Sequence, residues 1–111
     1  MSASFERPQP PYYAVIITSQ LTDEDREGYD EMARRMGELG VQQPGYLGRE
    51  GMSDDQGRDL TVIYYADDDS IKAWKAEVEH VEAQRLGKSR WYECYTVEVA
   101  RVERAYAFSR E

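Results

Sequence analysis

The stretch Leu60–Ala66, LTVIYYA, decides the fold, because it is dense in β-branched and aromatic residues and is the most strand-like run in the chain. We expect it to lie near the centre of a sheet. The sequence DDDS at residues 67–70 offers several helix N-caps directly after it. Apolar residues then recur at helical spacing, at Ile71, Trp74, Val78 and Val81. A helix ending at Gly87 is therefore predicted behind this strand.

A hairpin precedes the central strand. The segment Ser53–Asp59, SDDQGRD, has the composition of a turn, and the short run Tyr46–Met52 before it is typical of a strand. Pro44 and Gly45 mark another turn in front of that run. The two strands are expected to pair in antiparallel fashion.

The first strand is predicted at Tyr12–Ser19, YYAVIITS, which is apolar on both faces. Thr22 is the expected N-cap of the following helix, since three acidic residues come directly after it. The apolar stripe of this helix comprises Tyr29, Met32, Ala33, Met36 and Leu39. Gly40 is expected to end the helix in the left-handed conformation.

The last strand is predicted to run from Trp91 to Phe108, with a bulge or a doubly buried segment near Val99 and Ala100, where the apolar residues change face. The order strand, helix, strand, strand, helix, strand defines an α+β class, the ferredoxin-like β-α-β-β-α-β fold with a four-stranded antiparallel sheet. With 111 residues, the chain has room for a single domain. We predict a flexible arm at 1–11, the domain at 12–108 and a tail at 109–111.

Composition restricts the partners and the compartment. The formal net charge of -8 argues against nucleic acid, and no apolar run reaches the roughly 20 residues of a membrane span. Residues 1–11 lack the apolar core of a signal peptide. The single cysteine, Cys94, rules out an internal disulfide and is expected to be buried packing. A cytoplasmic protein without membrane contact is predicted.

Both helices of this fold cover one face of the sheet, so the other face needs water or another sheet against it. The strands Tyr12–Ser19 and Leu60–Ala66 carry tyrosine, valine or isoleucine on both faces. A monomer would then expose an apolar patch of the kind that marks an interface. We therefore predict a homodimer in which two sheets pack face to face.

The second half of the chain resembles the antibiotic biosynthesis monooxygenase (ABM) family, and the likeness extends over Tyr12–Tyr106. The residues that carry it are Ile71-Lys72-Ala73-Trp74, His80, Ala83-Gln84, Gly87, Trp91-Tyr92, Tyr95 and Val99-Ala100-Arg101-Val102. The resemblance implies a dimeric α+β barrel of ferredoxin-like protomers. It also implies a pocket between helices and sheet, in which a phenol or anthrone is deprotonated and reacts with O2 without a bound cofactor.

Several residues are candidates for the pocket that the resemblance implies. His80, the only histidine, is the natural general base, although it lies off the centre of its helix stripe and has a solvated surface position as its alternative. Arg101, like Arg104, can stabilise an oxygen anion or simply form an ion pair. Trp74 is expected in the core or the pocket lining. The strand tyrosines that can hold a phenolic substrate, or serve packing alone, are Tyr13, Tyr64, Tyr92 and Tyr95.

Two alternatives to an oxygenase stay open. The sequence contains no asparagine, whereas the resemblance implies one in the pocket of both activities known for the family. This difference favours a non-catalytic dimer that binds a small aromatic molecule. The third hypothesis, haem binding or degradation through His80, ranks last because the spacing of Trp74 and His80 differs from the spacing that the haem branch implies.

Overall fold

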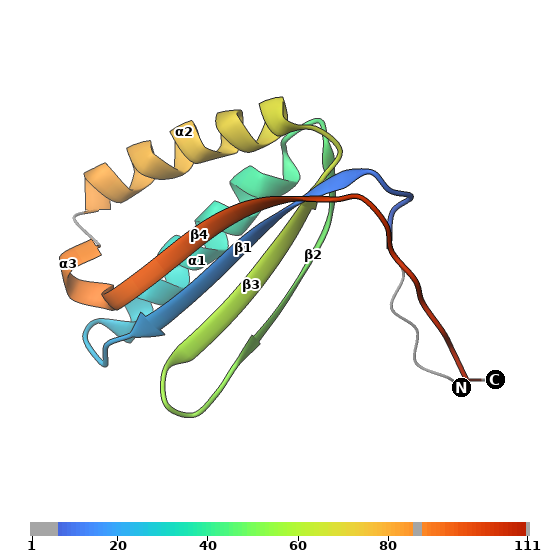
Figure 1. Cartoon of the computed structure of the whole chain (residues 1–111). Helices are drawn as coiled ribbons and strands as arrows, with labels where there is room; N and C mark the ends of the chain where they lie inside the picture. Colours follow the sequence, from blue (N-terminus) through green and yellow to red (C-terminus); the bar gives the residue numbers. More distant parts are fainter. Residues whose placement is uncertain (1–6, 86–87, 111) are drawn as a thin grey trace.

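The structure, a computed structural model, describes the backbone at residues 7–85 and 88–110, and the side chains at 7–79 and 90–110. The elements in chain order are β1 (Tyr12–Leu21), α1 (Arg26–Val41), β2 (Tyr46–Ser53), β3 (Arg58–Tyr65), α2 (Asp68–Arg85), α3 (Lys88–Trp91) and β4 (Tyr92–Val102) (Figure 1). Except for the one-turn helix α3, this is the predicted β-α-β-β-α-β order.

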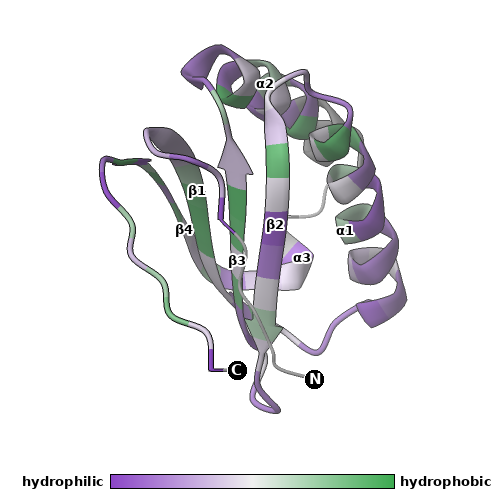
Figure 2. Cartoon of the chain, turned by 90° about the vertical axis from the view of Figure 1, so that its right-hand side faces the viewer, coloured by the Kyte–Doolittle hydropathy of each residue, from purple (hydrophilic) through white to green (hydrophobic). Residues whose placement is uncertain are grey.

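The four strands form one antiparallel sheet in the order β2-β3-β1-β4. Both long helices lie on the same side of this sheet, and the other side, which we call the open face, carries neither of them (Figure 2). The predicted α+β class and ferredoxin-like topology are thus confirmed. The prediction of LTVIYYA as a central strand is also correct, since β3 lies between β2 and β1.

The core lies between the helices and the two central strands. Its buried members are Val15, Ile63, Tyr65, Ile71, Trp74 and Val78. Because side chains alternate along a strand, the odd-numbered residues of β1 and β3 face the helices and the even-numbered ones form the open face. Two of these residues, Val15 and Tyr65, are completely buried.

The start of α1 differs from the prediction. The N-cap is Asp25 rather than Thr22, and it adopts a left-handed conformation with φ 48° and ψ 54°. Its carboxylate accepts a hydrogen bond from the amide of Gly28 at 3.3 Å. Thr22 instead donates its hydroxyl to the carbonyl of Arg90 and so connects the end of β1 to α3.

Gly40 has a different role from the predicted one. It lies inside α1, and the glycines with positive φ in the described chain are Gly48 and Gly57. Gly40 is buried beneath Tyr65 and Trp74, and a Cβ at this position would lie 3.2 Å from the tyrosine hydroxyl oxygen. The glycine therefore permits close packing of the helix rather than a left-handed turn.

The last strand is shorter than predicted, because β4 ends at Val102 and residues 103–110 have no regular structure. The register shift lies between Gln20 and Leu21 of β1, not near Val99 and Ala100, so the predicted bulge was misplaced. Val99 is also 51% exposed in the single chain, so the segment is not buried on both sides. β4 is an edge strand, and α2 does not close over it completely.

Cys94 is exposed, in contrast to the predicted buried position. It pairs with Gln20 near the beginning of β4, on the open face. The predicted end of α2 at Gly87 lies outside the described residues. Within the described part of the chain, no helix is both long and apolar enough to cross a membrane.

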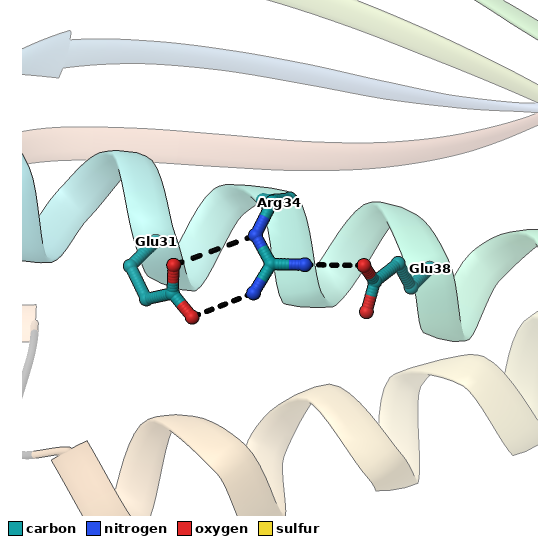
Figure 3. A network of polar contacts seen from close by, with 3 residues as sticks. All are labelled: Glu31, Arg34 and Glu38. Carbon is teal, nitrogen blue, oxygen red and sulfur yellow. Dashed lines mark hydrogen bonds and ion pairs between the residues drawn. The ribbon is translucent and has the colours of Figure 1, made fainter.

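The outer surface of α1 carries a chain of ion pairs. Arg34 contacts Glu31, one turn before it, at 2.6 Å and also pairs with Glu38, one turn after it (Figure 3). All three side chains are about half exposed, so the network contributes little beyond supporting the helix. It marks this side of α1 as a solvated surface.

Candidate functional site

A small cavity lies between α1 and the helix-facing side of the sheet, with a volume of about 70 Å³. The residues that line it are Ile17, Ser19, Tyr29, Ala33, Met36, Arg49, Asp59, Thr61, Ile63, Trp74 and Tyr92. Its apolar wall consists of aliphatic side chains from α1 and the central strands. Its polar wall is formed where β1 and β3 approach the hairpin turn.

Asp59 is the acidic group of this polar wall. It pairs with Ser19 of β1 and lies on the same side of β3 as Ile63, because the two are four residues apart. The hydroxyl of Thr61 donates a hydrogen bond to the Asp59 carboxylate at 3.2 Å. The hydrogen bond holds the carboxylate at the side of the sheet that faces α1.

Tyr29 closes the cavity from α1. Its ring lies edge-on to those of Trp91 and Tyr92, with centroids 6.3 and 5.8 Å away. Burial raises the pKa of Tyr29, and the negative charge of Asp59 raises it further, while a hydrogen bond with Tyr92 acts in the opposite direction. The phenol of Tyr29 is therefore kept protonated and can act as a hydrogen-bond donor at the polar wall.

Arg49 supplies the positive charge among the cavity-lining residues. Its guanidinium lies close over α1, because a Cβ at Gly37 would stand only 2.8 Å from its Nη1 atom. The same guanidinium counteracts part of the rise in the pKa of Tyr65. A site with one carboxylate and one guanidinium beside aromatic rings can remove a proton from a weak acid and hold the resulting anion.

A larger groove of about 410 Å³ opens between α2 and the edge strand β4. The residues that line it are Val15, Ile71, Trp74, Lys75, Val78, Glu79, Tyr95, Val97 and Val99. Apart from Lys75 and Glu79, which form an ion pair at 3.6 Å, the lining is apolar or aromatic. Trp74 lines both this groove and the small cavity, so its indole is a wall that the two share.

Trp74 is 7% exposed, and its Nε1 donor has no hydrogen-bond partner among the described residues. A buried unpaired donor destabilises a protein by roughly 1–3 kcal/mol. The indole is held by packing against Gly40 and Tyr65 rather than by polar contacts. The tryptophan is thus a member of the core, which was one of the two positions expected for it.

Four of the predicted substrate-binding residues lie on the helix side of the sheet, and three of them line the cavity or the groove. Trp74 and Tyr92 line the cavity, and Trp74 and Tyr95 line the groove. Tyr13, partly buried, packs against the core cluster. Tyr64 lies on the open face instead, where its hydroxyl donates to Glu50 at 2.6 Å, so the sheet separates it from the other four predicted residues.

Of the two predicted catalytic residues, Arg101 is not among the described residues that line the cavity. Arg101 lies on β4, where it forms an ion pair with Glu103 at 3.2 Å, and about half of its side chain is exposed. His80 belongs to α2, but its side chain lies outside the described residues. Arg104 follows the end of β4 and is exposed.

The candidate groups missed in the sequence are Tyr29, Arg49 and Asp59. Asp59 has the same parity as Ile63 and Tyr65, which marks a charge on the apolar side of a strand, and this signal was available before the structure. Tyr29 was identified only as part of the helix stripe. Arg49 gave no such signal, because the short strand around it has no clear apolar side.

The fold defines the class of the protein. Similar solved structures include SnoaB, a cofactor-independent oxygenase from Streptomyces nogalater, with a TM-score of 0.64 and 11% identity over 88% of this chain and 97% of that chain. A provisionally named antibiotic biosynthesis monooxygenase from Nitrosomonas europaea has a TM-score of 0.66 and 19% identity, over 87% and 95%. Another from Caulobacter crescentus has a TM-score of 0.68 and 13% identity, over 85% and 92%. The chain thus has the fold of the ABM structures, which supports the resemblance found in the sequence.

Sequence comparison is more specific about the family. The chain is 46% identical over 101 residues to the "Uncharacterized protein YqjZ" of Bacillus subtilis (strain 168), covering 91% of this chain and 88% of that protein. The chain therefore belongs to the same family as YqjZ. No family model matches the sequence.

Proposed function

We propose that the protein is a cofactor-independent monooxygenase that oxidises a small aromatic or enolisable substrate with O2. The observation that carries this proposal is the presence of both Asp59 and Arg49 in the lining of a cavity whose other walls are mainly apolar and aromatic. The cofactor-independent oxygenase SnoaB, which has a similar fold, supports it. The site combines a base, a cation and aromatic walls on one side of the sheet.

Each group has a distinct task in this reaction. The carboxylate of Asp59 removes a proton from an activated CH2 group of the substrate, and the guanidinium of Arg49 stabilises the anion that results. The anion transfers electrons to O2 and forms a C–O bond, which gives a peroxide that takes up a proton. Loss of water then leaves a carbonyl. In total, CH2 and O2 give C=O and H2O, so O2 is the only oxidant.

The volumes of the cavity and the groove indicate where the substrate binds. A cavity of about 150 Å³ is known to accommodate benzene, whereas the cavity here has about 70 Å³ and is too small for an aromatic ring. The groove of about 410 Å³ is large enough for a fused aromatic ring system. We place the body of the substrate in the groove against Trp74, with its reactive carbon directed past the indole toward Asp59.

Turnover of an anthrone, followed as quinone absorbance and as O2 uptake, tests the proposal. The wild-type protein is expected to accelerate the reaction over buffer, and Asp59→Asn to lower kcat by roughly 10²- to 10⁴-fold, the usual contribution of a general base. Arg49→Gln is expected to lower kcat as well, because the anion loses its counter-charge.

Asp55→Asn is the matched control for this assay. Asp55 is an exposed acid in the turn between β2 and β3, close in sequence to Asp59 but outside the cavity lining. Its neutralisation should leave turnover unchanged. Full activity in Asp59→Asn would contradict the role of the carboxylate. Absence of acceleration by the wild-type protein across anthrones and quinols would contradict the monooxygenase itself.

The alternative function is non-catalytic binding of a small aromatic molecule. The observation that favours it is the groove, whose described lining is almost entirely apolar and includes neither Asp59 nor Arg49. A binding protein of this kind would take up anthrones or naphthols without oxidising them. Saturable binding without turnover separates this function from the first.

We further propose that the chain acts as a homodimer through its open face. Apolar side chains on this face support the proposal, since Met52 is 77% and Leu60 40% exposed in the single chain. A second sheet packed over them would remove this surface from water. Light scattering at micromolar protein concentration should give twice the chain mass.

A further inference from the structure

The short helix α3 is bound to the end of β1 and to the beginning of α1, which lie at the same end of the molecule (Figure 1). The backbone amide of Thr22 donates to the carbonyl of Trp91 at 2.9 Å, and the Thr22 hydroxyl donates to the carbonyl of Arg90. The Oδ2 atom of Asp25 accepts a hydrogen bond from the Trp91 indole at 3.2 Å and lies 3.7 Å from the Arg90 guanidinium. These contacts fix residues 90 and 91 against the first turn of α1.

Asp25 has an unfavourable backbone conformation at this contact. It is the one residue other than glycine with a positive φ, 48°, in the described part of the chain. The carboxylate lies back over α1, where Oδ1 accepts a hydrogen bond from the Gly28 amide at 3.3 Å and where a Cβ at residue 28 would collide with it. Backbone strain of this kind persists where the surrounding structure holds it, and it is frequent where a protein fixes a functional group.

Trp91, which is 4% exposed, holds the ring of Tyr29. The indole lies edge-on to the phenol ring, with centroids 6.3 Å apart. Tyr92 packs edge-on to the same ring at 5.8 Å, and the guanidinium of Arg26 lies 5.9 Å from its centroid. Tyr29 and Tyr92 line the small cavity, whereas Trp91 is not among its described lining residues. The contacts that begin at Asp25 therefore end on a side chain of the candidate site.

The hydroxyl of Tyr29 belongs to the polar wall of the cavity. Tyr29 and Asp59 both line the cavity, and the negative charge of Asp59 raises the pKa of the phenol, an effect second only to burial. A hydrogen bond with Tyr92 lowers the same pKa, as is expected when Tyr92 donates to the phenol oxygen of Tyr29. The hydrogen of Tyr29 then remains available to a group inside the cavity.

The proposed oxidation contains a step for which Asp59 and Arg49 alone are poorly suited. The peroxide formed from the carbanion and O2 has to take up a proton at its distal oxygen, which lies two bonds away from the carbon. Asp59 faces that carbon, because it removes the proton from it. Arg49 stays charged and stabilises anions rather than releasing protons. A further group that passes the proton from the carboxyl to the distal oxygen is therefore required.

We propose that Tyr29 passes the proton from Asp59 to the distal oxygen of the peroxide, and that Asp25 and Trp91 are positioning residues that hold Tyr29 for this transfer. Tyr29 is a phenol beside the carboxylate at the polar wall of the same cavity. Asp25 and Trp91 act through the ring contacts of Tyr29 and do not touch the substrate. The inference rests on the proposed monooxygenase function and names the proton path within it.

The protons and electrons of this path balance. In the first transfer the O–H bond of Tyr29 breaks as the peroxide anion becomes a hydroperoxide, and the carboxylic acid of Asp59 reprotonates the phenolate. Asp59 then removes the second hydrogen of the carbon as a proton, and the C–H electron pair forms the carbonyl as the O–O bond breaks. Tyr29 protonates the departing hydroxide to water and again recovers its proton from Asp59. O2 remains the only oxidant.

Tyr29→Phe tests the proton transfer, because phenylalanine keeps the ring contacts and removes only the hydroxyl. Anthrone oxidation is followed as O2 uptake, as quinone absorbance and as total hydroperoxide in a ferrous-ion oxidation assay. The variant is expected to form quinone roughly 10²-fold more slowly than the wild-type protein, the lower end of the usual contribution of a general acid. O2 uptake should fall less, so hydroperoxide accumulates in place of quinone. The wild-type protein should release little hydroperoxide.

The ratio of hydroperoxide to quinone also tests the two positioning residues. Trp91→Phe loses the indole N–H and Asp25→Ala loses its acceptor, so each should raise this ratio and lower kcat by at most about ten-fold, the usual contribution of one hydrogen bond. KM for the anthrone should stay unchanged, because neither residue lines the groove. Asp25→Asn retains an acceptor oxygen and tolerates the left-handed conformation, so it should restore the wild-type ratio. A purely structural role would lower the melting temperature of Asp25→Ala without changing the ratio.

Tyr12→Phe is the matched control. Tyr12 is a buried tyrosine that packs edge-on against Tyr64 on the open face and is not among the residues that line the cavity, so the ratio should not change. An unchanged ratio in Tyr29→Phe, with turnover intact, would contradict the proton transfer and leave the monooxygenase in place. A wild-type protein that oxidises no anthrone would instead remove the monooxygenase, and the role of Tyr29 with it.

Discussion

Gly40 of α1 lies directly against the indole of Trp74 in α2, so close that a Cβ on Gly40 would stand 3.3 Å from Nε1. The hydroxyl of Tyr65 approaches the same glycine and donates to its carbonyl at 3.4 Å. This contact fixes the position of the tryptophan that lines both the cavity and the groove. The packing of the two helices and the shape of the candidate site therefore depend on the absence of a side chain at Gly40.

Gly40→Ala is expected to destabilise the protein by about 1 kcal/mol. Overpacking against the buried rings of Tyr65 and Trp74 costs roughly 1–3 kcal/mol, and the better helix propensity of alanine offsets up to about 1 kcal/mol of it. Gly37→Ala is the matched control, because a Cβ there meets only the mobile end of Arg49. Urea denaturation should show a loss of stability for the first and no loss for the second.

The left-handed N-cap gives a second prediction. Asp25 accepts hydrogen bonds from the Gly28 amide and from the indole of Trp91, the latter at 3.2 Å. Asp25→Ala removes both and puts a Cβ-bearing residue with no polar group into the left-handed region, for an expected loss of roughly 1–3 kcal/mol. Asp25→Asn retains the cap and tolerates the conformation, so its thermal melting should lie much closer to wild type. Equal melting temperatures for the two variants would refute this role.

Alkaline pH should destabilise the fold through Tyr65. Burial raises the pKa of Tyr65 to about 12, against 10.0 for a free tyrosine. Because the folded protein favours the protonated phenol, this stabilisation is complete below pH 10 and is lost as the pH rises from about 10 to 12. The difference corresponds to roughly 2–3 kcal/mol.

Tyr65→Phe should therefore lose less stability over this pH range than the wild-type protein. Tyr64, whose pKa is also raised to about 12 by burial and by its hydrogen bond to Glu50, accounts for part of the remaining dependence. Tyr106→Phe serves as the control, since the ring is 89% exposed. Parallel pH profiles for wild type and Tyr65→Phe in chemical denaturation would show that the buried phenol is not responsible.

The two tryptophans report separately on ligand binding. Trp74 lines the groove, whereas Trp91 is buried beside Asp25 and Tyr29 and lines neither the groove nor the cavity. An anthrone or naphthol added to the protein should quench the fluorescence of Trp74. Trp91→Phe should retain this quenching and Trp74→Phe should lose most of it. The reverse result would place the ligand elsewhere.

The fold was largely predictable because the residues that determine it carry strong local signals. LTVIYYA has the composition of a strand between two others, and Ile71, Trp74 and Val78 repeat at helical spacing, so the order of elements followed directly. Element ends were less predictable. Thr22 has the chemistry of an N-cap, but its hydroxyl bonds to Arg90, which is distant in the sequence. Gly40 resembles a helix stop, but it is required by Trp74 and Tyr65.

The candidate site was less accessible to sequence reasoning, because it depends on which residues meet from different elements. Trp74, Tyr92 and Tyr95 were identified as aromatic residues near a helix and an edge strand, and the structure places them on one side of the sheet. Asp59 and Arg49 are separated in the sequence by a hairpin turn. Only the pairing of β2 with β3 and the position of α1 over them bring both to the same cavity.

Oxidation of an anthrone under 18O2 tests the proposed reaction most directly. The protein is expected to accelerate quinone formation without added metal or cofactor, and the new carbonyl to contain one atom of 18O, with the second oxygen atom released as water. The Asp59→Asn variant should form the same product roughly 10²- to 10⁴-fold more slowly than the wild-type protein. A carbonyl oxygen derived from water, or no acceleration by the wild-type protein, would contradict the proposed monooxygenase reaction.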